Sequence, residues 1–223
     1  MLIDEKRIEE FCRVWGSPLY FFDEDAFVRN YKHFEDCLRS VYSNYHVSYS
    51  YKTNYAPYIC RIVRNLGGYA EVVSDMELTI AKKVGNQAHH IVYNGPCKGP
   101  MLEDFLLQGG IVNVDNFEEL DRIIAFANCY PDHRIAIGIR VNIDIGQGFI
   151  SRFGIDDSEI ERVFAAVTPI ENMKIVGLHC HIGRSRSLEA WRNRAVRMLE
   201  IADARDQTQH RCFDLRVRGA FFF

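Results

Sequence analysis

The chain has 223 residues, of which 48% are hydrophobic and 13% aromatic, enough for one large domain or two small ones with a substantial core. Its 27 basic and 30 acidic side chains leave a formal net charge of -3, which gives no support for a nucleic-acid surface or a polybasic membrane anchor. No apolar run approaches the roughly 20 residues of a membrane helix, and residues 1–10 carry charges where a signal peptide would be apolar. We therefore expect a cytoplasmic protein.

The seven cysteines are odd in number, scattered, and contain no Cys-x-x-Cys. This pattern indicates neither a disulfide framework nor a zinc ribbon. We expect reduced and mostly buried thiols.

The chain begins with an amphipathic stretch at residues 4–14 and a short apolar run at residues 19–22, so we expect a helix and a strand within residues 1–26. From residue 27 to residue 223, strand-like and helix-like segments alternate, as in a parallel α/β domain. The expected strands lie near residues 46–51, 69–74, 90–94, 111–115, 134–142 and 174–182. The expected helices lie at residues 57–66, 76–84, 101–107, 117–128, 157–167 and 188–204.

The two faces of the later strands favour a (β/α)₈ barrel over an open doubly wound sheet. One face of residues 135–142 is entirely Ile and Val, whereas the other carries Ala136, Gly138, Arg140 and Asn142. Open sheets covered on both sides have near-continuous hydrophobic strands, whereas barrel strands carry polar residues toward the carboxyl-terminal mouth. We therefore predict a TIM-type barrel.

Chemically capable side chains stand at the carboxyl ends of these strands, where barrel enzymes build their active sites. They are Lys52, Glu71, Asn94, Asp115, Arg140, Asn142, His179 and His181. Each has a structural explanation when taken alone, such as a helix cap or an ion pair. Together they predict a catalytic or binding site.

Lys52 ends an alternating run in which it shares a face with Ser48 and Ser50, so the pattern aims it toward the interior. A lysine placed there either pairs or loses its proton, and a neutral amine can form a Schiff base with a carbonyl. The alternative is a strand-end lysine that reaches solvent.

His179 and His181 point to one side of their strand, a spacing that also suits metal ligands. No further distinctive ligands accompany them, so we expect no metal. A lysine, a carboxylate, an arginine and a stacking histidine suit pyridoxal 5′-phosphate, whose ring is an electron sink.

The chain resembles the fold-type III pyridoxal-phosphate decarboxylases, which include diaminopimelate, ornithine and arginine decarboxylases and are related to alanine racemase. Residues 51–54 are similar to the family's Tyr-x-Val-Lys-Ala-Asn segment, and residues 70–78 to its Asp-x-x-Ser-x-x-Glu-Leu segment. Residues 113–120 resemble Asn-Val-Asp-Ser-x-x-Glu-Leu. Residues 140–142, 151–154 and 177–183 follow in the family's order.

This resemblance implies a decarboxylase most like diaminopimelate decarboxylase, with an alanine racemase-like barrel and a homodimeric assembly. It implies that Lys52 holds pyridoxal phosphate as a Schiff base and that His181 stacks on the cofactor ring. Glu71 would lie beside the Schiff base, and Arg140 would lie under the cofactor. The substrate would be a small amino acid.

The resemblance weakens toward the carboxyl end. Arg184, followed by Ser185, stands where the family usually has a phosphate-binding Ser, and only Gly219 remains of the glycine loop expected after Asp214 and Leu215. The family's last barrel strands and its carboxyl-terminal β domain have no counterpart. We therefore expect an incomplete barrel with negligible decarboxylation by this chain alone.

Two other functions stay open. One is a non-catalytic homologue that binds pyridoxal phosphate or regulates a partner. The other is a lysine barrel of the aldolase type without pyridoxal phosphate, which leaves the histidine and arginine motifs unexplained.

Overall fold

A computed structural model describes residues 4–143, 151–181 and 187–206 of the chain. The chain divides into two compact units, Met1–Tyr45 and His46–Phe223. The expectations about Arg184, Ser185 and residues 214–219 lie outside the described residues. The predicted start of the barrel at residue 27 stays a prediction.

The first unit contains two helices, α1 (Glu5–Trp15) and α2 (Glu24–Val41). Each is capped by an aspartate: Asp4 accepts a hydrogen bond from the Arg7 amide at 2.9 Å, and Asp23 accepts one from the Ala26 amide at 2.9 Å. Helix α2 is an addition to the expected order of elements. The prediction of a strand at residues 19–22 is wrong, because the described part of this unit contains no strand with which it could pair.

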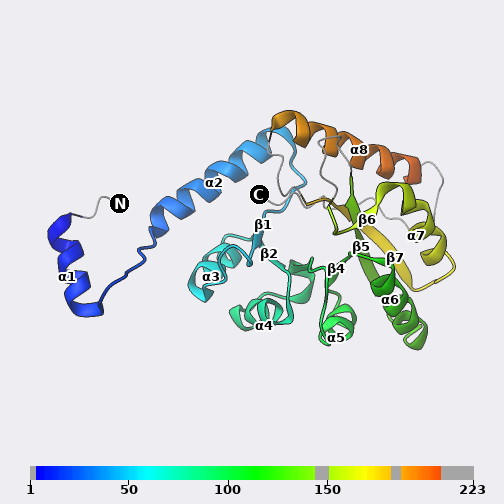
Figure 1. The fold of residues 1–223 in the computed structure, drawn as a ribbon, viewed down its shortest axis with the longest axis horizontal. Coiled ribbons are helices and arrows are strands. Elements are labelled where there is room, and N and C mark those ends of the chain that lie inside the picture. Colours follow the sequence, from blue (N-terminus) through cyan, green and yellow to red (C-terminus); the bar gives the residue numbers. More distant parts are fainter. Residues whose placement is uncertain (1–3, 144–150, 182–186, 207–223) are drawn as a thin grey trace. The chain divides into compact units, whose positions relative to one another are not determined.

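The second unit alternates strands with helices, as predicted (Figure 1). Its strands are β1 (Ser48–Ser50), β2 (Tyr69–Val72), β3 (Ile91–Tyr93), β4 (Ile111–Val114), β5 (Ile135–Asn142), β6 (Ile155–Asp156) and β7 (Met173–His179). Its α-helices are α3 (Pro57–Asn65), α4 (Asp75–Val84), α5 (Leu102–Leu107), α6 (Phe117–Cys129), α7 (Ile160–Val167) and α8 (Leu188–Asp206). Several strands are shorter than predicted, and β1 ends at Ser50, two residues before Lys52.

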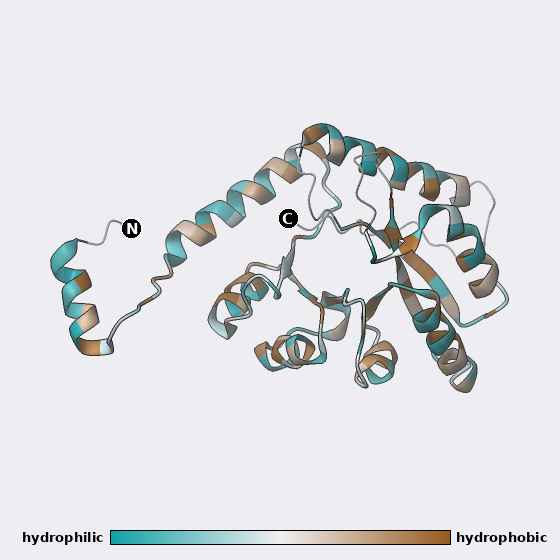
Figure 2. Ribbon diagram, in the orientation of Figure 1, coloured by the Kyte–Doolittle hydropathy of each residue, from teal (hydrophilic) through white to brown (hydrophobic). Residues whose placement is uncertain are grey.

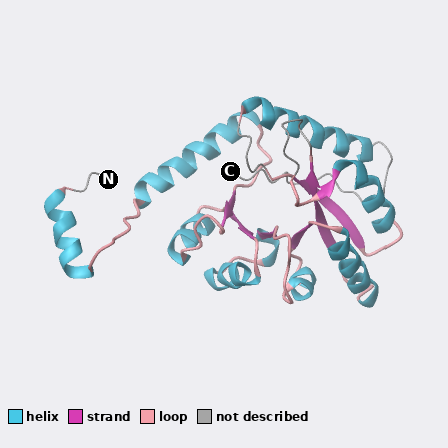
Figure 3. Ribbon diagram, viewed as in Figure 1, coloured by secondary structure: helices cyan, strands magenta, loops and turns pink. Residues whose placement is uncertain are grey.

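All strand pairs in the sheet are parallel, and the strands from β1 to β5 pair in chain order (Figure 3). Strand β7 pairs with the first part of β5, with Arg140 opposite His179, whereas β6 pairs with the end of β5. Within the described ranges, β1 and β7 are not paired with each other. The carboxyl ends of all these strands consequently face the same way.

The hydrophobic core lies between the sheet and helices α3 to α7, which follow the outer side of the arc of strands (Figure 1). In β5 the alternating Ile135, Ile137, Ile139 and Val141 are all buried in this core, and the strands around β5 and β7 are largely hydrophobic (Figure 2). The polar residues Asn113 and Arg140 belong to the opposite strand face. The predicted division into an apolar outer face and a small or polar inner face is confirmed.

None of the helices in the portion that the structure describes combines the length and the apolar composition needed to span a lipid bilayer.

Candidate functional site

Lys52 lies in a turn directly after β1 and is exposed. The turn is closed by Thr53, whose amide and hydroxyl donate to the Ser50 carbonyl at 3.2 and 2.7 Å. Strand β1 ends at Ser50, so the predicted alternation does not continue as a strand to Lys52, whose residue is exposed and not buried. That its side chain faces the interior stays a prediction. The neighbouring Tyr51 is buried and accepts a hydrogen bond from Asn86 at 3.2 Å, which anchors the turn while the lysine amine stays accessible.

Glu71 lies on β2, opposite Ser50 of β1 in the parallel register. Its side chain is only 2% exposed, although a carboxylate is costly to bury. Oε1 accepts a hydrogen bond from Asn94 Nδ2 at 3.1 Å, whereas buried Oε2 has no hydrogen-bond partner among the described residues. A buried acceptor left open in this way is a place where a ligand can donate a hydrogen bond.

Asn94 follows β3 and links Glu71 to Asn113 of β4, since its Oδ1 accepts a hydrogen bond from Asn113 Nδ2. Both asparagines are buried. Asn113 requires a glycine on the next strand, because a Cβ on Gly138 would overlap its Oδ1. Polar side chains of β2, β3 and β4 thus form one buried hydrogen-bonded row.

Arg140 of β5 donates to Asp115, which follows β4, at 2.6 Å, and both residues are buried. The guanidinium also lies over the ring of Phe153, 5.2 Å from its centre. An ion pair therefore follows the buried hydrogen-bonded row toward β5, the next strand of the sheet. The ion pair fixes the position of the guanidinium.

His179 is buried at the end of β7, opposite Arg140 in the register. Burial places its pKa well below the usual range, and the charges of Arg140 and Lys52 act in the same direction. His181 is exposed as a residue, but the protein atoms around its ring and the cations Lys52 and Arg140 lower its pKa to about 4. Both imidazoles are consequently neutral near pH 7.

A second lysine, Lys98, contacts the backbone of Asn113, and its side chain is fully buried. Its ammonium contacts both carboxylate oxygens of Glu119 at 2.9 and 2.8 Å, and it donates to the carbonyls of Gly95 and Asn113 at 2.7 and 2.8 Å. Burial lowers the pKa of Lys98 and raises the pKa of Glu119, while the attraction between the two charges opposes both shifts. Glu119 also accepts from the Asp115 amide at 2.9 Å, which ties this pair to the site.

The Ser-x-x-Glu and Asn-x-x-Glu parts of the two motifs prove to be helix caps. Ser74 Oγ accepts from the Glu77 amide at 3.3 Å at the start of α4, and Glu77 accepts from the Val73 amide at 2.8 Å. Asn116 and Glu119 repeat this arrangement at the start of α6, where Asn116 accepts from the Glu119 amide at 2.9 Å. These reciprocal bonds resemble a capping box and fix the chain just after β2 and β4.

The structure thus brings Lys52, Glu71, Arg140 and His181 to the carboxyl ends of one parallel sheet. Asn142 instead donates to the Ser151 carbonyl at 2.6 Å and supports the loop around Phe153. Asn113, Lys98 and Glu119 are not among the predicted site residues. The alternation of β4 could have identified Asn113 as a site residue, because Asn113 stands two residues before Asp115 and shares its face. No local sequence pattern predicts the ion pair of Lys98 and Glu119.

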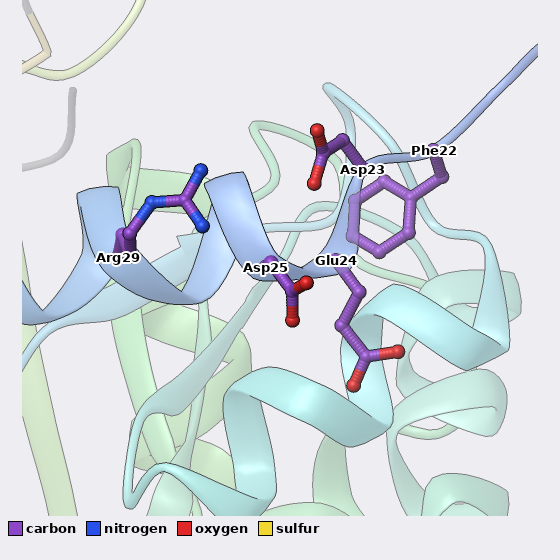
Figure 4. A pocket seen from close by; sticks show the side chains of 5 residues that line it. All are labelled: Phe22, Asp23, Glu24, Asp25 and Arg29. Carbon is purple, nitrogen blue, oxygen red and sulfur yellow. The ribbon is translucent and has the colours of Figure 1, made fainter. Parts of the chain in front are cut away.

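A pocket in the first unit lies at the start of α2 and is lined by Phe22, Asp23, Glu24, Asp25 and Arg29. The Asp23 carboxylate projects to one side of the helix start, whereas those of Glu24 and Asp25 project to the other (Figure 4). Acidic residues in a first helical turn favour the helix through its dipole. This pocket contains none of the strand-end residues.

A family profile described as the pyridoxal binding domain of pyridoxal-dependent decarboxylases matches residues 24–219. A diaminopimelate decarboxylase of Aquifex aeolicus is 29% identical over 193 residues, which cover 82% of this chain and 45% of that protein. One of Bacteroides thetaiotaomicron is 30% identical over 189 residues, covering 77% of this chain and 47% of the relative. An L-glutamyl-[BtrI acyl-carrier protein] decarboxylase of Niallia circulans is 27% identical over 194 residues, covering 82% and 44%. The chain spans about half the length of the curated relatives it matches.

Solved structures show the same fold. A crystal structure from Aquifex aeolicus matches with a TM-score of 0.76 at 27% identity, over 90% of this chain and 48% of that chain. Diaminopimelate decarboxylase of Helicobacter pylori, complexed with L-lysine, matches with a TM-score of 0.79 at 24% identity, over 91% of this chain and 54% of that one. The parallel sheet and its helices therefore match the TIM-barrel part of diaminopimelate decarboxylases, and the predicted fold class is confirmed.

Proposed function

The chain belongs to the pyridoxal-dependent decarboxylases, and we propose that its strand-end site binds pyridoxal 5′-phosphate through Lys52, in a protein that decarboxylates an amino acid resembling diaminopimelate. One observation carries this proposal. An accessible lysine on a fixed turn follows Ser50, the strand partner of Glu71, whose buried carboxylate keeps one oxygen without a hydrogen-bond partner among the described residues.

The residues present fit such a cofactor. Its aldehyde needs an amine, its ring needs polar partners and a flat neighbour, and its phosphate favours cations. Lys52 supplies the amine, Glu71 Oε2 an open acceptor, and Arg140 a positive charge nearby. When bound, pyridoxal phosphate supplies the conjugated ring that accepts the electron pair left as carbon dioxide departs.

Each side chain has a separate task in this proposal. Lys52 forms the covalent attachment, and its backbone is held by the Thr53 turn so that little ordering is needed on binding. His181 lies against the ring as a neutral imidazole, since its pKa of about 4 leaves it uncharged near pH 7. Arg140, fixed by Asp115, holds its charge in one place beneath the cofactor.

Reductive trapping tests the binding proposal. The purified chain is incubated with pyridoxal phosphate, reduced with borohydride and mapped by peptide mass spectrometry. We expect the label on Lys52 and not on Lys98, which is buried and fully paired. A label spread over exposed lysines such as Lys83 and Lys174, or equal labelling after Lys52→Ala, would contradict the proposal.

The substrate proposal rests on the relatives, several of which are diaminopimelate decarboxylases. Carbon dioxide release by the protein from diaminopimelate, lysine, ornithine and arginine is the measurement, with diaminopimelate expected as the preferred substrate. This chain alone is expected to release negligible carbon dioxide, so attachment without release would favour a non-catalytic pyridoxal phosphate-binding homologue only in a protein extended to the length of the relatives. A homodimer is proposed on the family resemblance and is checked by sedimentation.

A further inference from the structure

The row from Asn113 through Asn94 to Glu71 crosses three neighbouring strands entirely inside the protein. The three residues are 5%, 3% and 2% exposed. Asn113 donates to Asn94, and Asn94 donates to Glu71 Oε1 at 3.1 Å. Each asparagine therefore donates a hydrogen bond from its side-chain amide to the next residue toward the carboxylate.

The direction of this row is set by chemistry. A carboxylate only accepts hydrogen bonds, so Asn94 must present its nitrogen to Glu71 and its oxygen to Asn113. Asn113 must then present its nitrogen. A flip of either amide would place two acceptors against each other, and a buried unsatisfied group costs roughly 1–3 kcal/mol.

The far end of the row is fixed by the surrounding chain. Lys98 donates to the Asn113 carbonyl at 2.8 Å, and Gly138 leaves the space that the Asn113 amide fills. Glu71 is consequently held through Oε1 by a support that cannot easily rotate. Its Oε2 is buried and has no partner in the part of the chain that the structure describes.

We propose that Asn94 and Asn113 are positioning residues that hold the Glu71 carboxylate so that Oε2 faces the bound cofactor. This inference rests on the proposed function, and it assigns roles to two residues that do not themselves touch the cofactor. They act through Glu71 alone. An ordinary stabilising role would predict that any change preserving the hydrogen bonds also preserves cofactor binding.

The first measurement needs no cofactor. Hydrogen exchange of the side-chain amides is followed by NMR in the full chain, with exposed Asn65 as the reference. We expect the amides of Asn94 and Asn113 to exchange at least about tenfold more slowly than that of Asn65, because both are buried and bonded. Equal rates would overturn the inference, since no fixed row would then exist.

The second measurement compares two asparagines. Asn94→Leu removes the side-chain donor to Glu71 Oε1 and should raise the dissociation constant for pyridoxal phosphate by about tenfold or more. Asn172→Leu is the matched control, because Asn172 donates to the carbonyls of Ala127, Tyr130 and His133 just before β7, at the opposite ends of the strands. The control should lower the unfolding midpoint while leaving the dissociation constant within about threefold. Equal effects on binding would overturn the inference.

The third measurement separates positioning from stability. Asn94→Asp alone puts two carboxylates in contact and should weaken both folding and binding. Adding Glu71→Gln restores a donor and an acceptor at every step of the row but moves the negative charge from residue 71 to residue 94. We expect this double variant to recover the unfolding midpoint and the slow exchange of Asn113 without recovering cofactor affinity.

Recovery of both properties in the double variant would show a purely structural role and overturn the inference. Absence of pyridoxal phosphate binding by the wild-type chain would instead defeat the proposed function. The two failures are thus distinguishable.

Discussion

The carboxyl ends of the strands form two unlike regions. From β2 to β5, the polar side chains of Glu71, Asn94, Asn113, Asp115 and Arg140 are buried and contact one another across neighbouring strands. At β1 and after β7, Lys52 and His181 are exposed. The buried region is suited to holding groups in place, whereas the exposed region leaves an amine and an imidazole accessible to a ligand. A site that must both orient and react needs both properties.

The two lysines provide the strongest test of this contrast. Lys98→Met removes one half of a buried ion pair and leaves the Glu119 carboxylate unpaired, so it should lower the free energy of unfolding by about 3–5 kcal/mol. Lys52→Met changes an exposed side chain and should stay within about 0.5 kcal/mol. Urea unfolding of the full chain measures both.

Cofactor binding should respond in the opposite order. Lys52→Met should abolish reductive labelling, whereas Lys98→Arg, which keeps the charge, should retain it if the variant folds. A Lys52→Met variant as unstable as Lys98→Met would contradict the division into a buried and an accessible region.

The glycine on β5 tests the packing of the buried region. Gly138→Ala would place a Cβ against Asn113 Oδ1, and the amide is held by Asn94, so we expect a loss of about 1–3 kcal/mol by urea unfolding. Asn113→Ala opens the same space. Adding Gly138→Ala to Asn113→Ala should therefore cost little, and an undiminished cost would assign the effect to the backbone of β5.

Much of the second unit could be predicted because its signals are local. Apolar alternation in β5 and amphipathic helices between strands identify a parallel sheet with one polar face, and the strand ends then locate Glu71 and Arg140. The fate of Lys52 could not be read in this way, because a three-residue strand and a turn closed by Thr53 interrupt the alternation. Lys98 reads as a loop residue between Gly95 and Gly99. Its partner Glu119 lies 21 residues away, and only the fold brings them together.

Helix α2 was predictable in principle, since Phe27, Tyr31, Phe34 and Leu38 recur at helical spacing. The apolar run at residues 19–22 instead suggested a strand. A strand needs a neighbour, and composition alone does not show whether one exists.

The helix caps that directly follow the strands of the buried region should have moderate effects on the free energy of unfolding. Asn116→Ala removes the acceptor for the Glu119 amide at the start of α6 and should lower the free energy of unfolding by about 1 kcal/mol. Asn116→Ser keeps a capping oxygen and should lose less. Because Glu119 also binds the Asp115 amide, Asn116→Ala should in addition weaken pyridoxal phosphate binding slightly, and stability loss with unchanged binding would limit the cap to a structural role.

The smallest expected effect concerns the exposed region, where His181 reports on Lys52. The pKa of His181 is lowered from 6.5 to about 4 by the surrounding protein atoms, with Lys52 and Arg140 contributing through their charges. Lys52→Ala removes one of these cations, so the pKa of His181 should rise, as measured by NMR titration of the imidazole in the full chain. Lys174→Ala, an exposed lysine near the start of β7, is the control and should leave the titration unchanged.

The same shift gives the sign of a pH effect on folding. The unfolded imidazole takes up its proton as the pH falls below 6.5, whereas the folded one resists until about 4. Protons then bind preferentially to the unfolded chain, so the stability that His181 contributes is complete above pH 6.5 and is lost progressively down to about pH 4. His181→Gln should flatten the pH dependence of unfolding over this interval. Two results would contradict this account: an unchanged pH profile in His181→Gln, and a His181 titration unaffected by Lys52→Ala. Together they would show that Lys52 and His181 do not influence each other, so that they could not be treated as one region.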